Sequence, residues 1–344
     1  MIAPTDRGLY CEAGDFYIDP WQPVDRAIIT HAHGDHLTLG SRAYLCATPS
    51  RALVQHRLGM ATPVESIEYG TEITIDGVRL SFHPAGHILG SSQVRIESHG
   101  EIWVASGDYK RASDPTCAPF EPQRCHAFIT EATFALPIFR WDDPAETVAD
   151  IVEWWDEMRQ AGRPAVVFGY ALGKAQRLLA ELASRTDRPI YVHGALDDLL
   201  AIYGDAGVRL PETRRATEAP RGTSFAGELI VAPITARGSV WMRRFRDHSS
   251  AFVSGWMRIR GARRRRGYDR GFALSDHADW DGLLRTIEET GAERVFVTHG
   301  YTQTFARALV ERGIDAQPWQ TLYEGEPQAE PQAEPRAEQQ VDPS

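Results

Sequence analysis

The chain reads His31-Ala-His-Gly-Asp-His36, which places four side chains that commonly bind metal ions within six positions. This motif directly follows the apolar segment Arg26 to Ile29, so we expect it to form a loop at the end of a strand. Alternate residues of an extended loop point the same way, so the first two histidines can bind one metal ion while the aspartate and the last histidine face a second. The alternative is a polar turn that is rich in histidine by chance, and the ordered spacing disfavours it.

Three further residues with metal-binding side chains also follow predicted strands. His87 stands in Pro-Ala-Gly-His-Ile-Leu-Gly-Ser, Asp108 follows the segment 102–105, and His299 follows the segment 294–298. A hydrolytic metal site needs about three protein ligands per ion, and a carboxylate such as Asp108 can bridge two ions. Taken alone, each of these residues is more often an ordinary loop residue. Together with the first motif they predict one site for two metal ions.

The predicted elements divide the chain into an antiparallel part and an alternating α/β part. Its 344 residues allow two domains, or one domain with a large insertion. In the first third, Asp76-Gly77 and His99-Gly100 separate short apolar segments and predict two antiparallel hairpins. From residue 146 onward strands alternate with helices, which predicts a parallel sheet. We expect strands at 165–168, 190–192, 229–232, 251–254 and 294–298, and helices at 146–159, from 173, near 196, at 281–290 and at 303–312.

The composition is typical of a globular enzyme, with 42% hydrophobic and 24% charged residues. The start of the chain has no basic region followed by an apolar run, and no apolar stretch is long enough to span a membrane. We therefore expect a cytoplasmic protein with no membrane contact. The four cysteines are widely spaced and form no Cys-x-x-Cys pair, which argues against a disulfide framework and against a thiolate zinc site.

The net charge of −10 argues against a nucleic-acid partner, because phosphates favour basic surfaces. Half of this charge comes from the segment after Tyr323, whose polar, proline-rich repeats predict a disordered acidic tail over 323–344. In contrast, Arg258 to Arg266 is a dense cationic strip, and guanidinium groups suit bidentate contacts with phosphate. A GC-rich genome is the alternative explanation for the bias toward arginine.

The motifs resemble those of the metallo-β-lactamase superfamily, in the same order, over about Cys11 to Trp319. Glu131, His277 and His299 are similar to the three extra motifs of its β-CASP nuclease branch. By that resemblance, the first metal ion is held by His31, His33, His87 and Asp108, and the second by Asp35, His36, Asp108 and His299. Asp19, in Tyr-Ile-Asp-Pro, is expected to support the motif loop.

The resemblance also implies an α/β fold, namely a metallo-β-lactamase αββα sandwich with an inserted β-CASP α/β domain. The expected bounds are 1–135 for the first part of the sandwich, 136–270 for the inserted domain and 271–322 for the second part. The alternation of strands and helices fits an insertion at this place. The expected cofactors are two divalent metal ions, with zinc favoured and manganese as the alternative.

Phosphodiester cleavage needs a nucleophile, charge neutralisation at phosphorus and a proton for the departing oxygen. Metal ions supply the first two, and a histidine held by a carboxylate can supply the third. The β-CASP resemblance assigns that role to His277 and Glu131, and Asp19 and Asp35 complete the expected catalytic set. The alternative for His277 is an incidental position in a helix-capping sequence.

Three basic elements are candidates for substrate contact. Tyr170 to Lys174 begins a helix after a strand, so its backbone N–H groups and the lysine could hold a phosphate. Lys110 and Arg111 follow Asp108 closely, and the cationic strip leads toward the His277 motif. A solvated basic face is the alternative for each element. The residues expected to bind substrate are Lys110, Arg111, Lys174, Arg258, Arg260, Arg263 and Arg264.

Four stretches, 107–111, 131–141, 173–177 and 275–280, most resemble the bacterial DNA-ligase-associated exonucleases. We therefore expect a DNA exonuclease that processes DNA ends in repair and has a functional link to a DNA ligase. An RNA-processing β-CASP ribonuclease is the alternative, because eukaryotic DNA-specific members carry valine where this chain has His299. The large insertion and the arginine strip disfavour a small-molecule metallohydrolase, and the complete ligand set disfavours a catalytically silent nucleic-acid-binding module.

Overall fold

The computed structural model describes residues 1–259 and 267–323, and the strands of this part form three sheets. The first sheet has the order β1 (Ile2–Pro4), β2 (Leu9–Cys11), β3 (Phe16–Ile18), β4 (Arg26–Ile29), β5 (Ala43–Ala47) and β6 (Val64–Ile67). The second has the order β19 (Asp315–Pro318), β18 (Arg294–Thr298), β11 (Ala127–Glu131), β10 (Glu101–Ala105), β9 (Ser92–Ser98), β8 (Val78–Pro84) and β7 (Ile73–Ile75). The third has the order β14 (Thr213–Arg215), β13 (Ile190–Val192), β15 (Leu229–Pro233), β12 (Ala165–Gly169), β16 (Ser249–Val253) and β17 (Arg270–Phe272).

Helices connect and cover these sheets. The α-helices are α1 (Arg51–Leu58), α2 (Pro144–Gln160), α3 (Lys174–Leu182), α4 (Asp197–Asp205), α6 (Trp280–Thr290) and α7 (Thr302–Val310). Short 3-10 helices are η1 (Glu12–Gly14), η2 (Thr48–Ser50), η3 (Gly194–Leu196), η4 (Ile234–Ala236), η5 (Val240–Arg244) and η6 (Gly255–Arg258).

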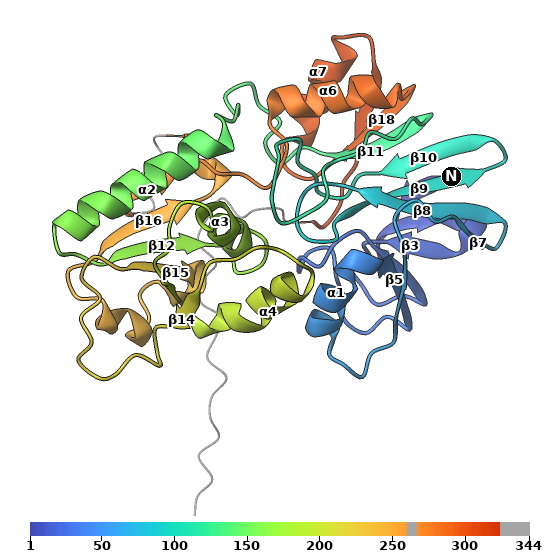
Figure 1. The fold of residues 1–344 in the computed structure, drawn as a ribbon. Coiled ribbons are helices and arrows are strands. Elements are labelled where there is room, and N and C mark those ends of the chain that lie inside the picture. The colour runs from blue at the N-terminus through green and yellow to red at the C-terminus, as the bar shows by residue number, and fades with distance from the viewer. Residues whose placement is uncertain (260–266, 324–344) are drawn as a thin grey trace, which may run out of the picture.

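The first two sheets pack face to face and share one hydrophobic core (Figure 1). Ile18 and Ile28 enter this core from the first sheet, and Phe82, Ile96 and Phe296 enter it from the second. Helix α1 packs on the outer face of the first sheet, whereas α6 and α7 pack on the outer face of the second. The four layers confirm the predicted αββα sandwich.

The third sheet is parallel throughout and is covered on both faces. Because both faces are covered, its central strand β12 is the continuous buried run Ala-Val-Val-Phe-Gly rather than an alternating pattern. Helices α2 and α3 pack on one face. Helix α4 joins the two parts of the molecule, because Leu200 packs into the core of the third sheet while Leu199 and Tyr203 pack with α1 of the sandwich.

The capping residues of α6 fix where the segment before it lies. The carboxylate of Asp279 accepts a hydrogen bond from the N–H of Gly282 at 2.8 Å, and Gly291 ends the helix in the left-handed region at φ +61°. Substituting an N-cap aspartate usually costs about 1 kcal/mol, so the start of α6 is well defined. His277 lies two residues before this cap, and its position is therefore tied to a fixed helix end.

The structure agrees with most of the predicted elements. Both hairpins form, since β7 pairs with β8 and β9 with β10 in antiparallel fashion, and the third sheet is parallel as predicted. The antiparallel pairing predicted in the first third does not extend to β3, β4, β5 and β6, which pair in parallel. Helix α1 was not predicted, because only Leu53 and Val54 of its eight residues are buried and no helical apolar period results.

Some sequence-based expectations concern residues outside the described ranges. Arg260, Arg263 and Arg264, which were expected to bind substrate, and the tail after Tyr323 belong to this group. We propose that residues 136–270 form the inserted domain, and the strands of the third sheet support this, although β17 extends the sheet to Phe272. None of the described helices combines the length and apolar character that a bilayer crossing requires.

Candidate metal centre

The predicted metal-binding residues meet at one edge of the sandwich. The motif of residues 31–36 follows β4 of the first sheet. In the second sheet, β8, β10, β11 and β18 all run in the same direction, because β9 is antiparallel to both β8 and β10 while β11 is parallel to both β10 and β18. Their carboxyl ends therefore lie at one edge, and they carry His87, Asp108, Glu131 and His299.

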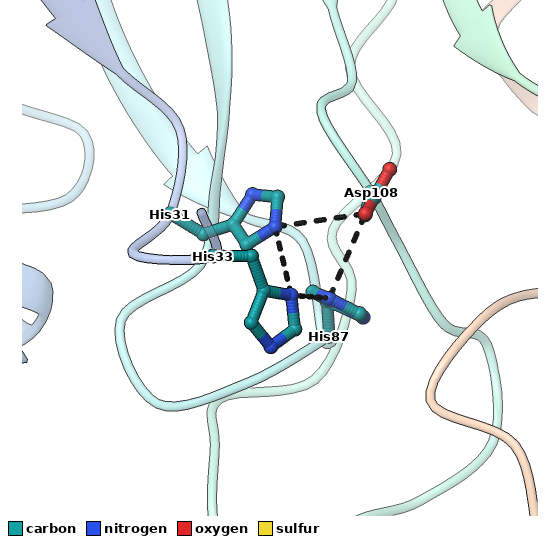
Figure 2. Close-up of side chains that lie close together, drawn as sticks. All are labelled: His31, His33, His87 and Asp108. Carbon is teal, nitrogen blue, oxygen red and sulfur yellow. Dashed lines mark hydrogen bonds and ion pairs between the residues drawn. The ribbon is translucent and has the colours of Figure 1, made fainter. Parts of the chain in front are cut away.

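The first group consists of His31, His33, His87 and Asp108, whose side chains point toward one another (Figure 2). His33 Nδ1 lies 3.2 Å from His31 Nε2 and 3.0 Å from His87 Nε2. Asp108 Oδ2 lies 3.6 Å from His31 Nε2 and 3.8 Å from His87 Nε2. In a tetrahedral zinc site with bonds of 2.0–2.2 Å, the ligand atoms are about 3.3–3.6 Å apart. The donor set and its spacing therefore fit one tetrahedral ion.

Hydrogen bonds to the outer ring nitrogens orient these imidazoles. His31 Nδ1 lies 3.0 Å from Thr30 Oγ1, and His33 Nε2 donates to the carbonyl of Leu172 at 3.2 Å. His87 Nδ1 donates to the carbonyl of Asp276 at 2.7 Å. Such contacts set the tautomer and the plane of a metal-binding histidine. Leu172 and Asp276 could not be identified from a side-chain motif, because both contribute backbone carbonyl groups.

The second group consists of Asp35, His36 and His299, and it adjoins the first through Asp108. His36 Nε2 lies 3.1 Å from His299 Nε2, 3.8 Å from Asp35 Oδ2 and 3.4 Å from Asp108 Oδ2. Asp108 Oδ1 lies 3.8 Å from His299 Nε2, and among the described residues this buried oxygen has no hydrogen-bond partner. Because an unsatisfied buried carboxylate oxygen is costly, its position between the two groups fits a bridge between two cations.

Asp19 holds the motif loop from behind. Its carboxylate accepts hydrogen bonds from the N–H of Thr30 at 2.8 Å and from His36 Nδ1 at 2.7 Å. His36 Nε2 is thereby directed toward the second group. His299 is oriented in a similar way, with its Nδ1 2.9 Å from Thr298 Oγ1. The structure thus places Asp19 directly behind His36 and Thr30.

The charge states of His31, His87, His299 and Asp108 suit cation binding. Burial lowers the pKa of His31 and His87 well below the usual value, and it lowers the pKa of His299 to about 4, so these imidazoles are neutral near pH 7. Burial acts to raise the pKa of Asp108, but the surrounding histidines, His36 first, together hold that pKa well below the usual value. Neutral imidazoles and an ionised carboxylate are the forms that bind metal ions. Burial acts to lower the pKa of His36, but the carboxylates around it, Asp108 first, hold that pKa well above the usual value.

His277 and Glu131 form a buried pair beside the two groups. His277 Nδ1 donates to the Glu131 carboxylate, at 2.9 Å from Oε2 and 3.0 Å from Oε1, and Glu131 Oε1 also accepts from the N–H of Tyr109 at 2.8 Å. Asp108, Glu131 and His277 each present an atom within 4.8 Å of the others. The pair therefore lies beside the carboxylate of Asp108.

Lys110 and Lys174 do not lie where a substrate could reach their ammonium groups. Lys110 Nζ pairs with Asp114, and Lys174 Nζ pairs with Asp276 Oδ2 at 2.8 Å. Both lysine side chains are at most 1% exposed. This corrects the expectation of substrate contact for the two lysines. The sequence shows their charge but not the acids that pair with them in the fold.

Arg111 and Arg258, which were also expected to bind substrate, lie nearer the surface. Arg111 pairs with Glu289 at 2.6 Å, and Arg258 pairs with Asp142 at 2.6 Å. Both arginine side chains remain partly exposed, so a phosphate can compete for them. The turn before α3 differs from the expectation of an open phosphate cradle, because the N–H of Gly173 donates to Gln176 Oε1 at 2.7 Å and the carbonyl of Leu172 accepts from His33.

A buried charge cluster, Lys110, Asp114, Lys174, Arg177 and Asp276, joins α3 to the loop that carries His277. Arg177 donates to the carbonyl of Ser275, and its Nη1 lies 3.2 Å from Asp276 Oδ1 while its Nε lies 3.3 Å from Asp114 Oδ2. Burial acts to raise the pKa of Asp276, but the nearby cations, Lys174 first, hold it far below the usual value. Charged side chains are rarely this buried unless they are paired. Arg177 and Asp276 could not be identified from the sequence because their partners lie far away in the chain. Asp114 pairs with Lys110, four positions before it, as well as with the distant Arg177.

We expect Arg177→Met to destabilise the protein by about 3–5 kcal/mol, because it leaves two buried carboxylates and a backbone carbonyl short of a partner. Urea unfolding followed by circular dichroism measures this loss. Arg185→Met is the matched control, since Arg185 is exposed just beyond the end of α3. Equal stability of the two variants would show that the cluster contributes no net stability.

Comparisons with known proteins identify relatives over most of the chain, although no family model matches it. It is 32% identical over 313 residues to a probable DNA ligase of Opitutus terrae, covering 90% of the chain and 30% of the ligase. An RNase J-like protein of Methanocaldococcus jannaschii is 24% identical over 230 residues, which cover 58% of the chain and 54% of that protein. A ribonuclease of Thermus thermophilus is 27% identical over 227 residues, which cover 55% of the chain and 50% of that protein.

The chain therefore spans between 30% and 54% of the length of these three relatives. Its αββα sandwich, its parallel third sheet and its strand-end clusters of histidine and aspartate agree with the fold of this group. Taken with the relatives, these features assign it to one family: the chain belongs to the β-CASP branch of the metallo-β-lactamase superfamily.

Proposed function

We propose that this chain is a two-metal phosphodiesterase, and specifically a DNA exonuclease that processes DNA ends in repair. The observation that carries the proposal is the place of Asp108, which lies between two groups of metal-binding side chains and also within 4.8 Å of the His277–Glu131 pair. Metal-binding side chains alone are compatible with many hydrolases. A buried histidine–carboxylate pair beside them adds the proton donor that an alkoxide leaving group requires.

We assign the first ion to His31, His33, His87 and Asp108, and the second to Asp35, His36, Asp108 and His299, with Asp19 holding His36 in place. Imidazole nitrogens and carboxylate oxygens at tetrahedral spacing favour zinc, and manganese is the alternative. When bound, the two ions provide a nucleophile at neutral pH and neutralise charge on the phosphate.

The residues of the chain then supply the proton. Glu131 accepts a hydrogen bond from the Nδ1–H group of His277 and so keeps the ring oriented. The Nε2 atom, on the other side of the ring, delivers a proton to the departing oxygen as the bond from phosphorus to that oxygen breaks. Phe134 lies 5.8 Å from the imidazole between ring centres and helps to keep bulk water away from it.

DNA is favoured as the substrate because the relative that aligns with 90% of the chain is named a probable DNA ligase. That relative also supports a functional link to DNA joining. The alternative is an RNA-processing enzyme, which is supported by the ribonuclease names of other relatives and by the histidine at position 299. A nucleic-acid substrate of either kind would reach Arg111 and Arg258, which we propose as contacts outside the metal centre.

End-labelled DNA and RNA strands of one sequence, digested with Zn²⁺ or Mn²⁺, test the proposal. We expect mononucleotide release from linear DNA, slower cleavage of RNA, and resistance of circular DNA of the same sequence. Chelation with EDTA should stop the reaction and added metal should restore it. Faster cleavage of RNA would support the ribonuclease alternative, and cutting of circular DNA would exclude an exonuclease.

A further inference from the structure

Tyr323, at the end of the described chain, lies against the second group of metal-binding side chains. Its ring stacks on that of His299, with centroids 4.2 Å apart and planes 2° apart, and on that of His36 at 4.7 Å and 3°. Only 9% of the residue is exposed, and Trp21 packs edge-on against it at 5.3 Å. The rings of His36 and His299 are thus held in parallel planes by a residue that belongs to none of the sequence motifs.

The hydroxyl group of Tyr323 reaches the backbone that supports the same group. It donates to the carbonyl of Asp19 at 3.0 Å, with the carbonyl of Ile18 at 3.3 Å. The carboxylate of Asp19 in turn accepts from His36 Nδ1. Tyr323 therefore contacts His36 directly through its ring and also holds the residue that orients it.

The backbone conformations of Asp19 and His299 independently indicate that surrounding contacts must hold both residues in place. Asp19 and His299 have φ values of +42° and +58°, in the left-handed region that residues other than glycine rarely occupy. Such conformations persist when surrounding contacts hold them in place, and they gather at functional sites. Tyr323 contacts both residues, one through its hydroxyl group and the other through its ring.

We infer that Tyr323 is a positioning residue for the second metal ion, which sets the ring planes of His36 and His299 so that both Nε2 atoms point at one position. This inference rests on the proposed function only in taking the second group as a metal site. The Nδ1 contacts of His36 and His299 fix the rotation of each ring, and the flat face of Tyr323 limits the tilt of both. Its ring contacts are with the second group and Trp21, so we expect a selective effect on the second ion.

The test is calorimetric titration of the metal-stripped full chain with Zn²⁺, comparing wild type with Tyr323→Leu and Tyr323→Phe. We expect Tyr323→Leu to keep one tightly bound ion and to weaken the other by about 10- to 100-fold, the usual effect of losing a group that orients a metal ligand. Tyr323→Phe keeps the stacked ring and loses only the hydroxyl group. Its affinity for the second ion should therefore lie between those of the wild type and Tyr323→Leu. The control is Leu322→Ala, whose side chain is 65% exposed.

Failure of this inference can be distinguished from failure of the proposed function, because the titration needs no nuclease activity. Unchanged binding of both ions in Tyr323→Leu, or binding of only one ion by the wild type, would overturn the inference. An equal weakening of both ions together with a lower melting temperature would show a general structural role instead. Two ions in the wild type and one in the variant would support the inference even if no nucleic acid were cleaved.

Discussion

His277→Ala should slow DNA cleavage by about 10²- to 10⁴-fold, the usual effect of removing a general acid, while both metal ions remain bound. The imidazole is held by Glu131 at 2.9 Å and belongs to neither of the two groups that we assign as metal sites. Its loss therefore removes the proton for the departing oxygen and leaves the ions in place. Single-turnover cleavage of end-labelled DNA measures the loss, and plasma-emission analysis counts the ions.

A substrate with a better leaving group separates this role from a structural one. Bis(p-nitrophenyl) phosphate releases a phenolate that needs little protonation, so its hydrolysis should be much less affected by His277→Ala. The matched control is His56→Ala, since His56 is exposed on α1. Equal losses on both substrates, or a missing ion, would show that His277 shapes the site rather than donates a proton.

Asp108→Ala should abolish hydrolysis and lower the metal content of the protein. One oxygen of this carboxylate lies 3.4–3.8 Å from nitrogens of His31, His36 and His87, and the other lies 3.8 Å from His299. Its removal takes a ligand from both groups at once and also removes the negative charge between them. Metal analysis after dialysis, together with DNA digestion, checks this expectation.

Asp187→Ala provides the control for Asp108→Ala, because Asp187 is exposed in the loop before β13. Circular dichroism should show that both variants are folded. Two ions per chain and normal cleavage in Asp108→Ala would refute the assignment of the metal centre.

The sequence was most informative where chemistry and strand ends coincide. The loops after β4, β8, β10 and β18 could be predicted because short apolar segments end at residues that bind metal ions. Helix α1 could not, because most of its surface is exposed and its pattern is weak.

The role of a side chain could not be predicted where it depends on partners that only the fold brings close. Lys174 was expected to contact phosphate because it begins a helix after a strand, and Lys110 because it follows Asp108 closely. In the fold, buried acids pair with both lysines. Tyr323 was missed for a related reason. It was included in the disordered tail expected over 323–344. The structure corrects this for Tyr323, which is buried and contacts Asp19, more than 300 positions earlier in the chain.

Two contacts described above couple the metal centre to the third sheet. The carbonyl that orients His33 belongs to Leu172, between β12 and α3, and the carbonyl that orients His87 belongs to Asp276, just after β17. A displacement of the third sheet would therefore disturb two of the residues that we assign to the first ion. By thermodynamic linkage, a nucleic acid that binds the third sheet and shifts its position must change the affinity of that ion, and the ion must change the affinity of the nucleic acid by the same factor. The affinity for the first metal ion and the affinity for nucleic acid would then be thermodynamically coupled.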